Sequence, residues 1–169
     1  VRLGKDRLAV LIGDVSGKGV PAALYMVKII TDFRSIISAE EGPSKVIEDL
    51  NGRLCQQSTM GMFATVIFGI FDAGTGEFAF VNGGHPAPVL IDCQNNIRLA
   101  DGERNPPVGI QEKLKYAQSS VSLRPQDRLL CYTDGVIEAR NKEKNEYGIG
   151  RLFEVLKKAA GDPKKVVNT

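Results

Sequence analysis

The chain has 169 residues, of which 43% are hydrophobic and 25% are charged, and its formal net charge is +2. This ordinary globular composition predicts one domain, residues 1–169, with its own hydrophobic core. The small net charge argues against a protein that binds nucleic acid mainly by electrostatic attraction, and no apolar run reaches the roughly 18 residues that a membrane span needs.

The first predicted elements are a strand and a helix joined by a glycine-rich turn. The apolar run Leu8–Ile12 ends at Gly13 and is typical of a buried strand. From Gly19, apolar residues recur at steps of three and four, which predicts a helix. The predicted buried face of this helix consists of Ala23, Met26, Ile30, Phe33 and Ile37. The segment EEGPS ends it, and a second helix is predicted with Ile47, Leu50 and Leu54 on its apolar face.

The middle of the chain has the pattern of β-structure. Strands are predicted at residues 63–72, 77–82 and 88–92. The short connections GTG and GGHPA between them favour antiparallel hairpins. The segment DGERNPPVG, residues 101–109, is predicted to be a loop that its prolines make rigid.

The last third is predicted to hold two more strands and a helix. The strands, 117–123 and 128–133, are joined by RPQD, and the final helix is marked by Ile149, Leu152, Phe153 and Leu156. The GDP tripeptide at 161–163 should end this helix. Strands that meander through short turns, with helices in separate blocks, predict an α+β fold rather than alternating β-α-β units.

The glycine-rich turn GDVSGKG, residues 13–19, is open to several interpretations. A nucleotide-binding P-loop needs four residues between its first glycine and the Gly-Lys pair, whereas three separate Gly13 from Gly17 here. A dinucleotide fingerprint, G-x-G-x-x-A, begins at Gly17, but the later strands do not form the parallel unit that it requires. Aspartate is also common in turns, so an ordinary turn at Asp14 is a third interpretation.

A second acidic turn favours a metal site. Asp14 and Asp134 are each expected to end an apolar strand, in GDVSGKG and YTDGV. Two carboxylates that face each other are unfavourable without a counter-charge. Mg²⁺ and Mn²⁺ supply that charge and prefer carboxylate and carbonyl oxygens as ligands. The residues therefore predict a divalent-cation site that includes Asp14 and Asp134.

Cysteine and histidine do not suggest another metal. The three cysteines are far apart, and there is a single histidine, His85, so ligands for a structural zinc site are lacking. Cys55 and Cys131 are expected to be buried as small apolar residues. Free cysteines fit a cytoplasmic protein. Because the chain begins at Val1, we expect it to be part of a longer protein.

Five motifs occur in order along the chain: GDVSGKGVPAALYM, MFATVIFGIFD, VNGGHPAPVLI, PPVGI and YTDGVIEARN. Together they resemble the bacterial metal-dependent protein serine/threonine phosphatases of the stage II sporulation protein E (SpoIIE) and RsbU type, within the type 2C (PPM) superfamily. The resemblance implies a four-layer α-β-β-α sandwich, with two antiparallel sheets flanked by helices. It also implies two Mn²⁺ or Mg²⁺ ions that hold a water molecule as the nucleophile.

The resemblance implies specific roles for the residues of the acidic turns. Asp14 would bridge both ions, Val15 would bind one of them through its backbone carbonyl, and Asp134 would be a further ligand, so that Asp14 and Asp134 are the expected catalytic residues. Ser16 stands where some relatives have a histidine, and Lys18 is its neighbour. We expect these two residues to contact the phosphate, and His85 to have a structural role in its turn.

The resemblance also implies partners. Relatives act on anti-sigma-factor antagonists of the STAS fold (anti-anti-sigma factors) and are often fused to sensor domains, so the expected substrate is a phosphorylated regulatory protein in bacterial signal transduction. Two acid motifs of the family, one before and one after these residues, are absent from the chain, and we therefore expect weak metal binding and slow turnover. The alternative is a catalytically silent module that binds a signalling partner or forms a homodimer through its long helices.

Overall fold

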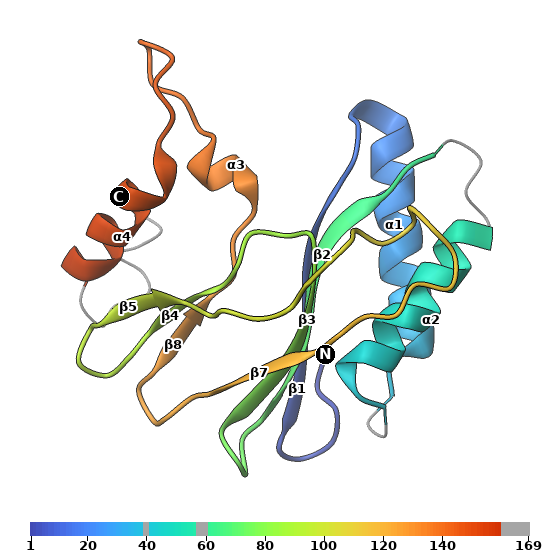
Figure 1. Cartoon of the computed structure of the whole chain (residues 1–169), viewed down its shortest axis with the longest axis horizontal. Helices are drawn as coiled ribbons and strands as arrows, with labels where there is room; N and C mark the ends of the chain where they lie inside the picture. Colours follow the sequence, from blue (N-terminus) through green and yellow to red (C-terminus); the bar gives the residue numbers. More distant parts are fainter. Residues whose placement is uncertain (39–40, 57–60, 160–169) are drawn as a thin grey trace. The chain divides into compact units, whose positions relative to one another are not determined.

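The computed structural model describes residues 1–38, 41–56 and 61–159. The chain divides into two compact units (Figure 1). The first unit consists of Val1–His85 and Asp101–Ser122, and the second of Pro86–Ala100 and Leu123–Thr169. Each unit contains one sheet and its own helices. No helix among the described residues has the length and apolar character that crossing a membrane would require.

The first unit is built on a sheet in the order β1-β2-β3-β6, with β7 also paired to β3. These strands are β1 (Arg7–Val15), β2 (Ala64–Asp72), β3 (Glu77–Gly83), β6 (Arg104–Asn105) and β7 (Ser119–Ser122). All pairs are antiparallel except the two-residue pair between β3 and β6. The predicted hairpin between residues 63–72 and 77–82 is confirmed as β2-β3.

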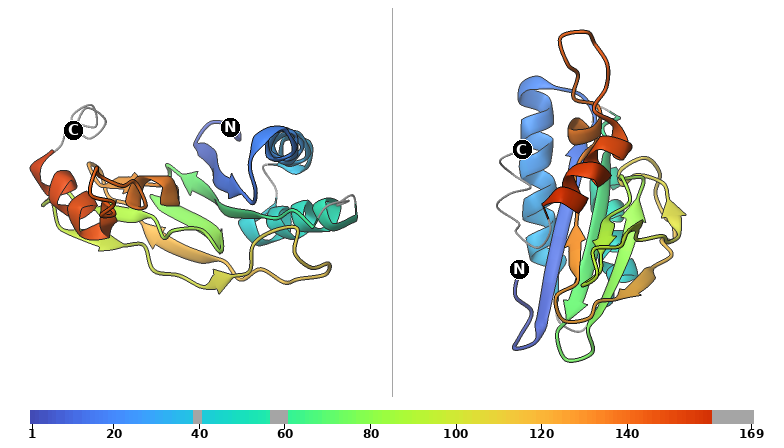
Figure 2. Two further views of the ribbon diagram at one scale, coloured as in Figure 1. Left: turned by 90° about the horizontal axis from the view of Figure 1, so that it is seen from above. Right: turned by 90° about the vertical axis from the view of Figure 1, so that its left-hand side faces the viewer.

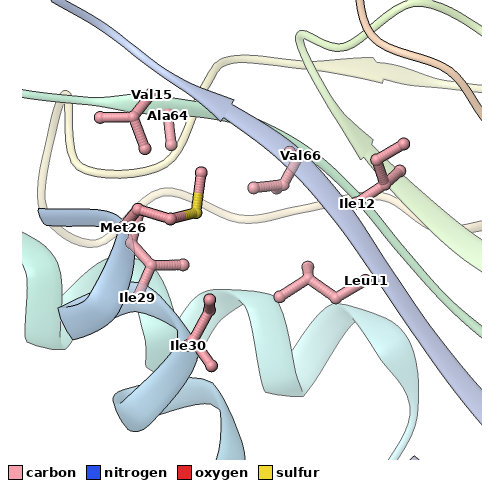
Figure 3. A pocket seen from close by; sticks show the side chains of 9 residues that line it. Leu11, Ile12, Val15, Met26, Ile29, Ile30, Ala64 and Val66 are labelled. Carbon is pink, nitrogen blue, oxygen red and sulfur yellow. The ribbon is translucent and has the colours of Figure 1, made fainter. Parts of the chain in front are cut away.

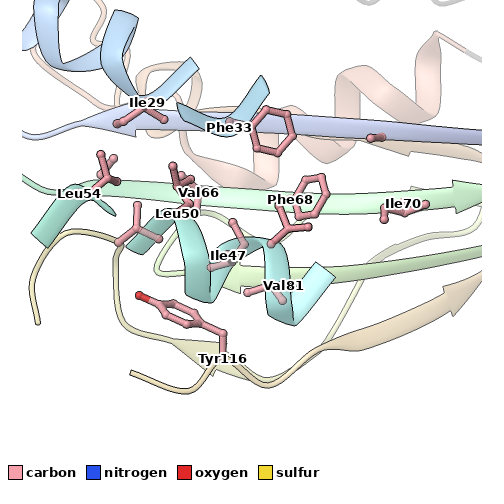
Figure 4. Packing of buried hydrophobic residues seen from close by; sticks show 14 of the residues in the cluster. Ile29, Phe33, Ile47, Leu50, Leu54, Val66, Phe68, Ile70, Val81 and Tyr116 are labelled. Atoms are coloured by element: carbon pink, nitrogen blue, oxygen red, sulfur yellow. The ribbon is translucent and has the colours of Figure 1, made fainter. Parts of the chain in front are cut away.

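Two helices cover one face of this sheet, α1 (Gly19–Ile36) and α2 (Pro43–Gln56). In Figures 1 and 2 both lie on the same side of β1, β2 and β3. Alternate residues of β2 face them, because successive side chains of a strand point to opposite faces. Figure 4 shows the resulting core, in which the ring of Phe33 meets that of Phe68 edge to face at 5.1 Å. Its buried members include Ile29, Phe33, Ile47, Leu50, Leu54, Val66, Phe68, Ile70, Val81 and Tyr116.

The predicted buried face of α1 is only partly right. The residues of α1 that are buried are Tyr25, Ile29 and Phe33, whereas Ala23 and Ile30 are exposed. The helix also exposes Val20, Leu24 and Val27. Because α1 carries apolar residues around most of its circumference, periodicity alone could not identify the face that packs on the sheet. The second helix is confirmed, with Ile47, Leu50 and Leu54 buried.

The second unit contains a three-stranded sheet in the order β5-β4-β8. Its elements are β4 (Val89–Ile91), β5 (Ile97–Leu99), β8 (Arg128–Leu130), α3 (Asp134–Ile137) and α4 (Gly148–Lys158). Leu152 and Leu156 of α4 pack against Val89, Ile91 and Tyr132. The predicted final helix is confirmed as α4, and the predicted break at 161–163 lies outside the described residues.

Three local predictions differ from the structure. The connection GGHPA does not form a hairpin, because β3 and β4 belong to different sheets. The strand predicted at 128–133 ends at Leu130, and the segment that follows leads into the short helix α3. The loop predicted at 101–109 contains the two-residue strand β6. The α+β class, with two antiparallel sheets and separate helices, is confirmed, and the single domain over 1–169 stays a prediction.

Candidate active site

The carboxyl end of β1 is packed so tightly that one of its positions requires glycine. A Cβ added to Gly13 would lie 2.7 Å from the carbonyl oxygen of Thr65 and 3.0 Å from Cγ1 of Val66. Real Cβ atoms do not approach a backbone oxygen so closely, so a side chain at residue 13 would push β1 away from β2. This explains the glycine that begins the GDV sequence.

Asp14 projects on the face of the sheet opposite to α1 and α2. Its neighbour Val15 is buried in the core under the helices, and successive side chains of a strand alternate between faces. The side chain of Asp14 is exposed. Within the described residues no hydrogen bond or ion pair involves its carboxylate. Both of its oxygens are therefore available to a cation.

The backbone carbonyl of Val15 points to the open edge of β1. Ser16 donates its N–H to the carbonyl of Phe63 at 2.9 Å, so this pair is hydrogen-bonded. Bonded and non-bonded pairs alternate in an antiparallel ladder, and the pair Val15–Ala64 is therefore non-bonded. Ala64 confirms this, because its own N–H and carbonyl bond Val108 on the other side of β2. The Val15 carbonyl thus faces away from β2.

Ser16 and Lys18 follow at the start of the turn. The hydroxyl oxygen of Ser16 accepts a hydrogen bond from the N–H of Phe63 at 3.0 Å, which fixes the beginning of β2. Its own hydrogen stays available for a ligand oxygen. Lys18 is extended and exposed, and it directly precedes α1. A positively charged residue at the N-terminus of a helix favours an anion there, because its charge adds to that of the helix dipole.

Asp134 lies in the second unit and is the first residue of α3. The expectation that it ends a strand is wrong, because β8 ends at Leu130 and three residues intervene before α3. Its side chain is half-buried. Since Asp14 and Asp134 belong to different units, their convergence on one ion cluster stays a prediction.

The oxygen atoms at the end of β1 are ligands of the type that Mg²⁺ and Mn²⁺ bind. The Asp14 carboxylate and the Val15 carbonyl are hard oxygen ligands on adjacent residues, which is the chemistry that these ions prefer. The described part of the chain contains no cluster of three or more His, Cys, Asp or Glu side chains that could hold a metal. Among the described residues of the first unit, the Asp14 carboxylate and the Val15 carbonyl are the oxygens that the sequence predicts as ligands, and their binding of a metal stays a prediction.

The cysteines near these elements are not poised for nucleophilic attack. Burial raises the pKa of the Cys131 thiol to about 11, and burial also raises the pKa of the Cys55 thiol. Both thiols are therefore protonated at neutral pH, and the thiolate is the reactive form. Cys131 is half-buried, close to the buried environment expected for it.

One group beside Asp14 was missed at the sequence level. Thr65 pairs directly with Asp14 across β1 and β2, and its Oγ1 lies 2.9 Å from Nδ1 of His85. Asn82 holds the backbone of His85 on both sides, accepting from its N–H at 2.8 Å and donating to its carbonyl at 2.9 Å. A threonine in a strand is an ordinary β-former, so only the register could reveal Thr65.

An apolar cavity of about 260 Å³ lies between α1 and β1 in the first unit (Figure 3). Its lining comes from Leu11, Ile12, Gly13, Val15, Met26, Ile29, Ile30, Ala64 and Val66. Gly13 and Val15 line it, so it lies on the helix side of β1, whereas Asp14 projects on the other side. The cavity is therefore not the place where ions would meet Asp14.

Comparisons with known proteins find a matching family and similar relatives. The family model described as stage II sporulation protein E (SpoIIE) matches residues 4–169. The chain is 33% identical to Protein IcfG of Synechocystis sp., over 91% of this chain and 28% of the relative. It is 28% identical to the phosphoserine phosphatase RsbU of Bacillus subtilis, over 82% of this chain and 41% of the relative. The chain thus spans less than half the length of either relative.

Solved structures show the same fold. The RsbU and RsbW domains of Rv1364c from Mycobacterium tuberculosis match with a TM-score of 0.82 and 30% identity, over 94% of this chain and 43% of that one. The PP2C phosphatase domain of SpoIIE from Bacillus subtilis matches with a TM-score of 0.79 and 20% identity, over 99% of this chain and 50% of that one. At that lower identity the likeness concerns the fold alone.

Proposed function

The chain belongs to the SpoIIE family, and on this premise we propose that it is a metal-dependent protein serine/threonine phosphatase of bacterial signalling. Family membership confirms the resemblance carried by the five motifs. The observation that supports the activity best is the end of β1, where an exposed Asp14 carboxylate without a partner among the described residues adjoins an outward-facing Val15 carbonyl. Two hard oxygen donors on adjacent residues suit Mn²⁺ or Mg²⁺.

In this proposal Asp14, the Val15 carbonyl and Asp134 hold the ions. When bound, two such ions activate water and neutralise charge on the phosphoryl oxygens. Lys18 attracts the phosphate, which carries a charge of about −1.5 to −2. The hydroxyl oxygen of Ser16 continues to accept a hydrogen bond from the N–H of Phe63, and its hydroxyl hydrogen is donated to a phosphoryl oxygen. No protein nucleophile is needed, which agrees with the protonated thiols of Cys55 and Cys131.

For the substrate we propose phosphoserine or phosphothreonine on a regulatory protein, such as an anti-anti-sigma factor of the STAS fold. Two relatives of Bacillus subtilis, RsbU and RsbP, are named phosphoserine phosphatases. Because the chain spans 41% and 35% of the lengths of these two relatives, we also propose that a fused sensor domain regulates it in a longer protein. A homodimer of this longer protein is part of the same proposal.

The test uses the 169-residue chain with Mn²⁺ and either p-nitrophenyl phosphate or a phosphoserine peptide. Asp14→Asn should lower phosphate release at least about 100-fold, since it removes a charged ligand of the ions while keeping the size of the side chain. Asp101→Asn is the matched control, because Asp101 is an exposed aspartate of the same unit. Equal activity of the Asp14 variant and the wild type would contradict the proposal.

A second candidate function rests on α1. Val20, Leu24 and Val27 are 72%, 65% and 60% exposed, which is unusual for apolar residues of one helix face. This exposed apolar face favours the interpretation that the chain is a catalytically silent module, which binds a partner or a second copy of the chain. Sedimentation equilibrium should then give a dimer mass that Leu24→Lys reduces to the monomer. A monomeric wild type with Mn²⁺-dependent activity would exclude this candidate as the function of the chain.

A further inference from the structure

We propose that His85 and Thr65 are positioning residues for Asp14. In the proposed relay His85 Nδ1–H donates to Thr65 Oγ1, and the Thr65 hydroxyl donates to the Asp14 carboxylate when Asp14 binds a cation, a hydrogen bond that the structure itself does not contain. The inference deepens the proposed function and rests on it. It assigns a task to two residues for which the sequence patterns predicted no catalytic or metal-binding role. All the groups it uses belong to the first unit.

The register places Thr65 at Asp14. The two residues are direct partners of the β1-β2 ladder. They form a hydrogen-bonded pair, because Ser16 and Phe63 are hydrogen-bonded two residues away, after Asp14 in the chain and before Thr65, and bonded pairs recur at every second residue of the ladder. Side chains of such partners share one face of the sheet, about 5.5 Å apart at Cα. Thr65 is therefore the side chain best placed on β2 to reach the Asp14 carboxylate.

His85 fixes the direction of the Thr65 hydroxyl. The 2.9 Å contact between Thr65 Oγ1 and His85 Nδ1 leaves two arrangements of the hydrogen. If Nδ1 carries a proton, it donates to Oγ1, and the hydroxyl hydrogen is then available to Asp14. If Nδ1 is unprotonated, the hydroxyl donates to the ring and has no hydrogen left for the carboxylate.

The ring itself is held by a rigid turn. His85 is 5% exposed and Asn82 is 7% exposed. The Asn82 amide binds both the N–H and the carbonyl of His85. Asn105 in turn donates to the carbonyl of Asn82 at 3.2 Å and to that of Ala117 at 2.9 Å. A ring held in this way keeps its orientation when an ion binds, as groups that orient metal ligands must.

The first measurement is the tautomer of His85. As the chain has one histidine, long-range ¹H–¹⁵N NMR spectra give a single set of imidazole signals. The relay requires the proton on Nδ1 in the wild type. A neutral ring with its proton on Nε2 overturns the proposal, whatever the activity of the chain.

The second measurement is Mn²⁺ affinity by calorimetry. Thr65→Val removes the hydroxyl at nearly constant volume and should weaken Mn²⁺ binding about 10-fold, the lower end of the effect of such supporting groups. Thr65→Ser retains the hydroxyl and should restore binding to within a few-fold of the wild type. Thr75→Val is the control, because within the part of the chain that the structure describes the Thr75 hydroxyl oxygen accepts just the backbone N–H of Glu77, at 3.3 Å. The melting temperatures of all four proteins show whether Thr65→Val is simply unfolded.

The outcomes separate this inference from the proposed function. If Mg²⁺ shifts the backbone amide signal of Val15 and Thr65→Val binds Mn²⁺ as tightly as the wild type, the site exists and the relay is wrong. If no ion shifts Val15 and no Mn²⁺ binding is detected, the proposed function fails and the relay fails with it. Weaker binding by Thr65→Val that Thr65→Ser does not restore also overturns the relay, since the loss then comes from packing.

Discussion

Asn51 of α2 accepts a hydrogen bond from the backbone N–H of Gly109 at 2.8 Å, and its amide also donates to the carbonyl of Gln111 at 2.9 Å. Asn51 is 1% exposed and its bond with the Gly109 N–H is buried, so water cannot replace that bond in the folded chain. Asn51→Ala should lower the free energy of unfolding by about 2–4 kcal/mol, because it leaves the buried N–H of Gly109 without its partner, removes the bond to the carbonyl of Gln111 and creates a cavity. Urea unfolding measures the loss, and a loss below about 0.5 kcal/mol would show that the segment around Gly109 is not anchored by this side chain.

Gly13→Ala should destabilise the chain and disturb the end of β1. The added Cβ would lie 2.7 Å from a backbone oxygen that cannot move without separating β1 from β2. We expect a loss of about 1–3 kcal/mol, the usual range for overpacking, together with reduced Mn²⁺-dependent activity. Gly52→Ala on α2 is the control, since it meets nothing within 4 Å, and it should stabilise by about 0.5–1 kcal/mol. Equal melting temperatures for the two variants would refute this account of Gly13.

The stability of the chain should fall in acid partly through Glu48. The hydrogen bond from Lys115 is the main reason that the pKa of Glu48 lies below its ordinary value, and the two atoms Lys115 Nζ and Glu48 Oε2 are 2.7 Å apart. A carboxyl whose pKa is lower in the folded state stabilises the fold above its unfolded pKa. That contribution is lost as the pH falls through the folded pKa. Glu48→Gln should therefore flatten the pH dependence of the melting temperature below about pH 4.5, whereas an unchanged profile would assign the acid sensitivity to other groups.

Lys18 should affect substrate binding more than the chemical step. Its exposed ammonium group at the start of α1 can attract a phosphate but packs against nothing that the fold needs. Lys18→Gln should raise KM for a phosphoserine peptide about 3- to 10-fold, leave kcat within a factor of two, and reduce the effect of salt on kcat/KM. Lys5→Gln, at another exposed lysine, should leave all three unchanged. A fall in kcat alone for Lys18→Gln would argue against this role.

Local patterns identified most of the elements. The runs that became β1, β2 and β3 were predicted because their apolar residues and bounding glycines suffice to define a strand. The helix α1 was placed correctly, but its buried face was not, because Leu24 and Val27 are as apolar as the residues that pack. The buried face of α1 packs against segments further along the chain, α2 and Phe68 of β2, and periodicity within α1 carries no information about those contacts.

The site was predictable in part. Asp14 and Val15 lie at the end of β1, as predicted from the GDV sequence. Asp134 begins a helix instead of ending a strand, because the apolar residues before it leave the ladder after Leu130. Thr65 became visible only through its register with Asp14. Register depends on pairing between distant segments, so composition and spacing within one segment could not supply it.

The outer edge of β1 has a consequence for handling the protein. Val1 and Ala9 exchange two hydrogen bonds there, but within the described residues no strand pairs with the outward-facing groups of Leu11, Gly13 and Val15. Such a border can template the addition of a strand from another molecule. Concentrated or warmed samples should therefore accumulate β-rich aggregates that bind thioflavin T, and dilute, cold storage should keep the chain monodisperse for longer.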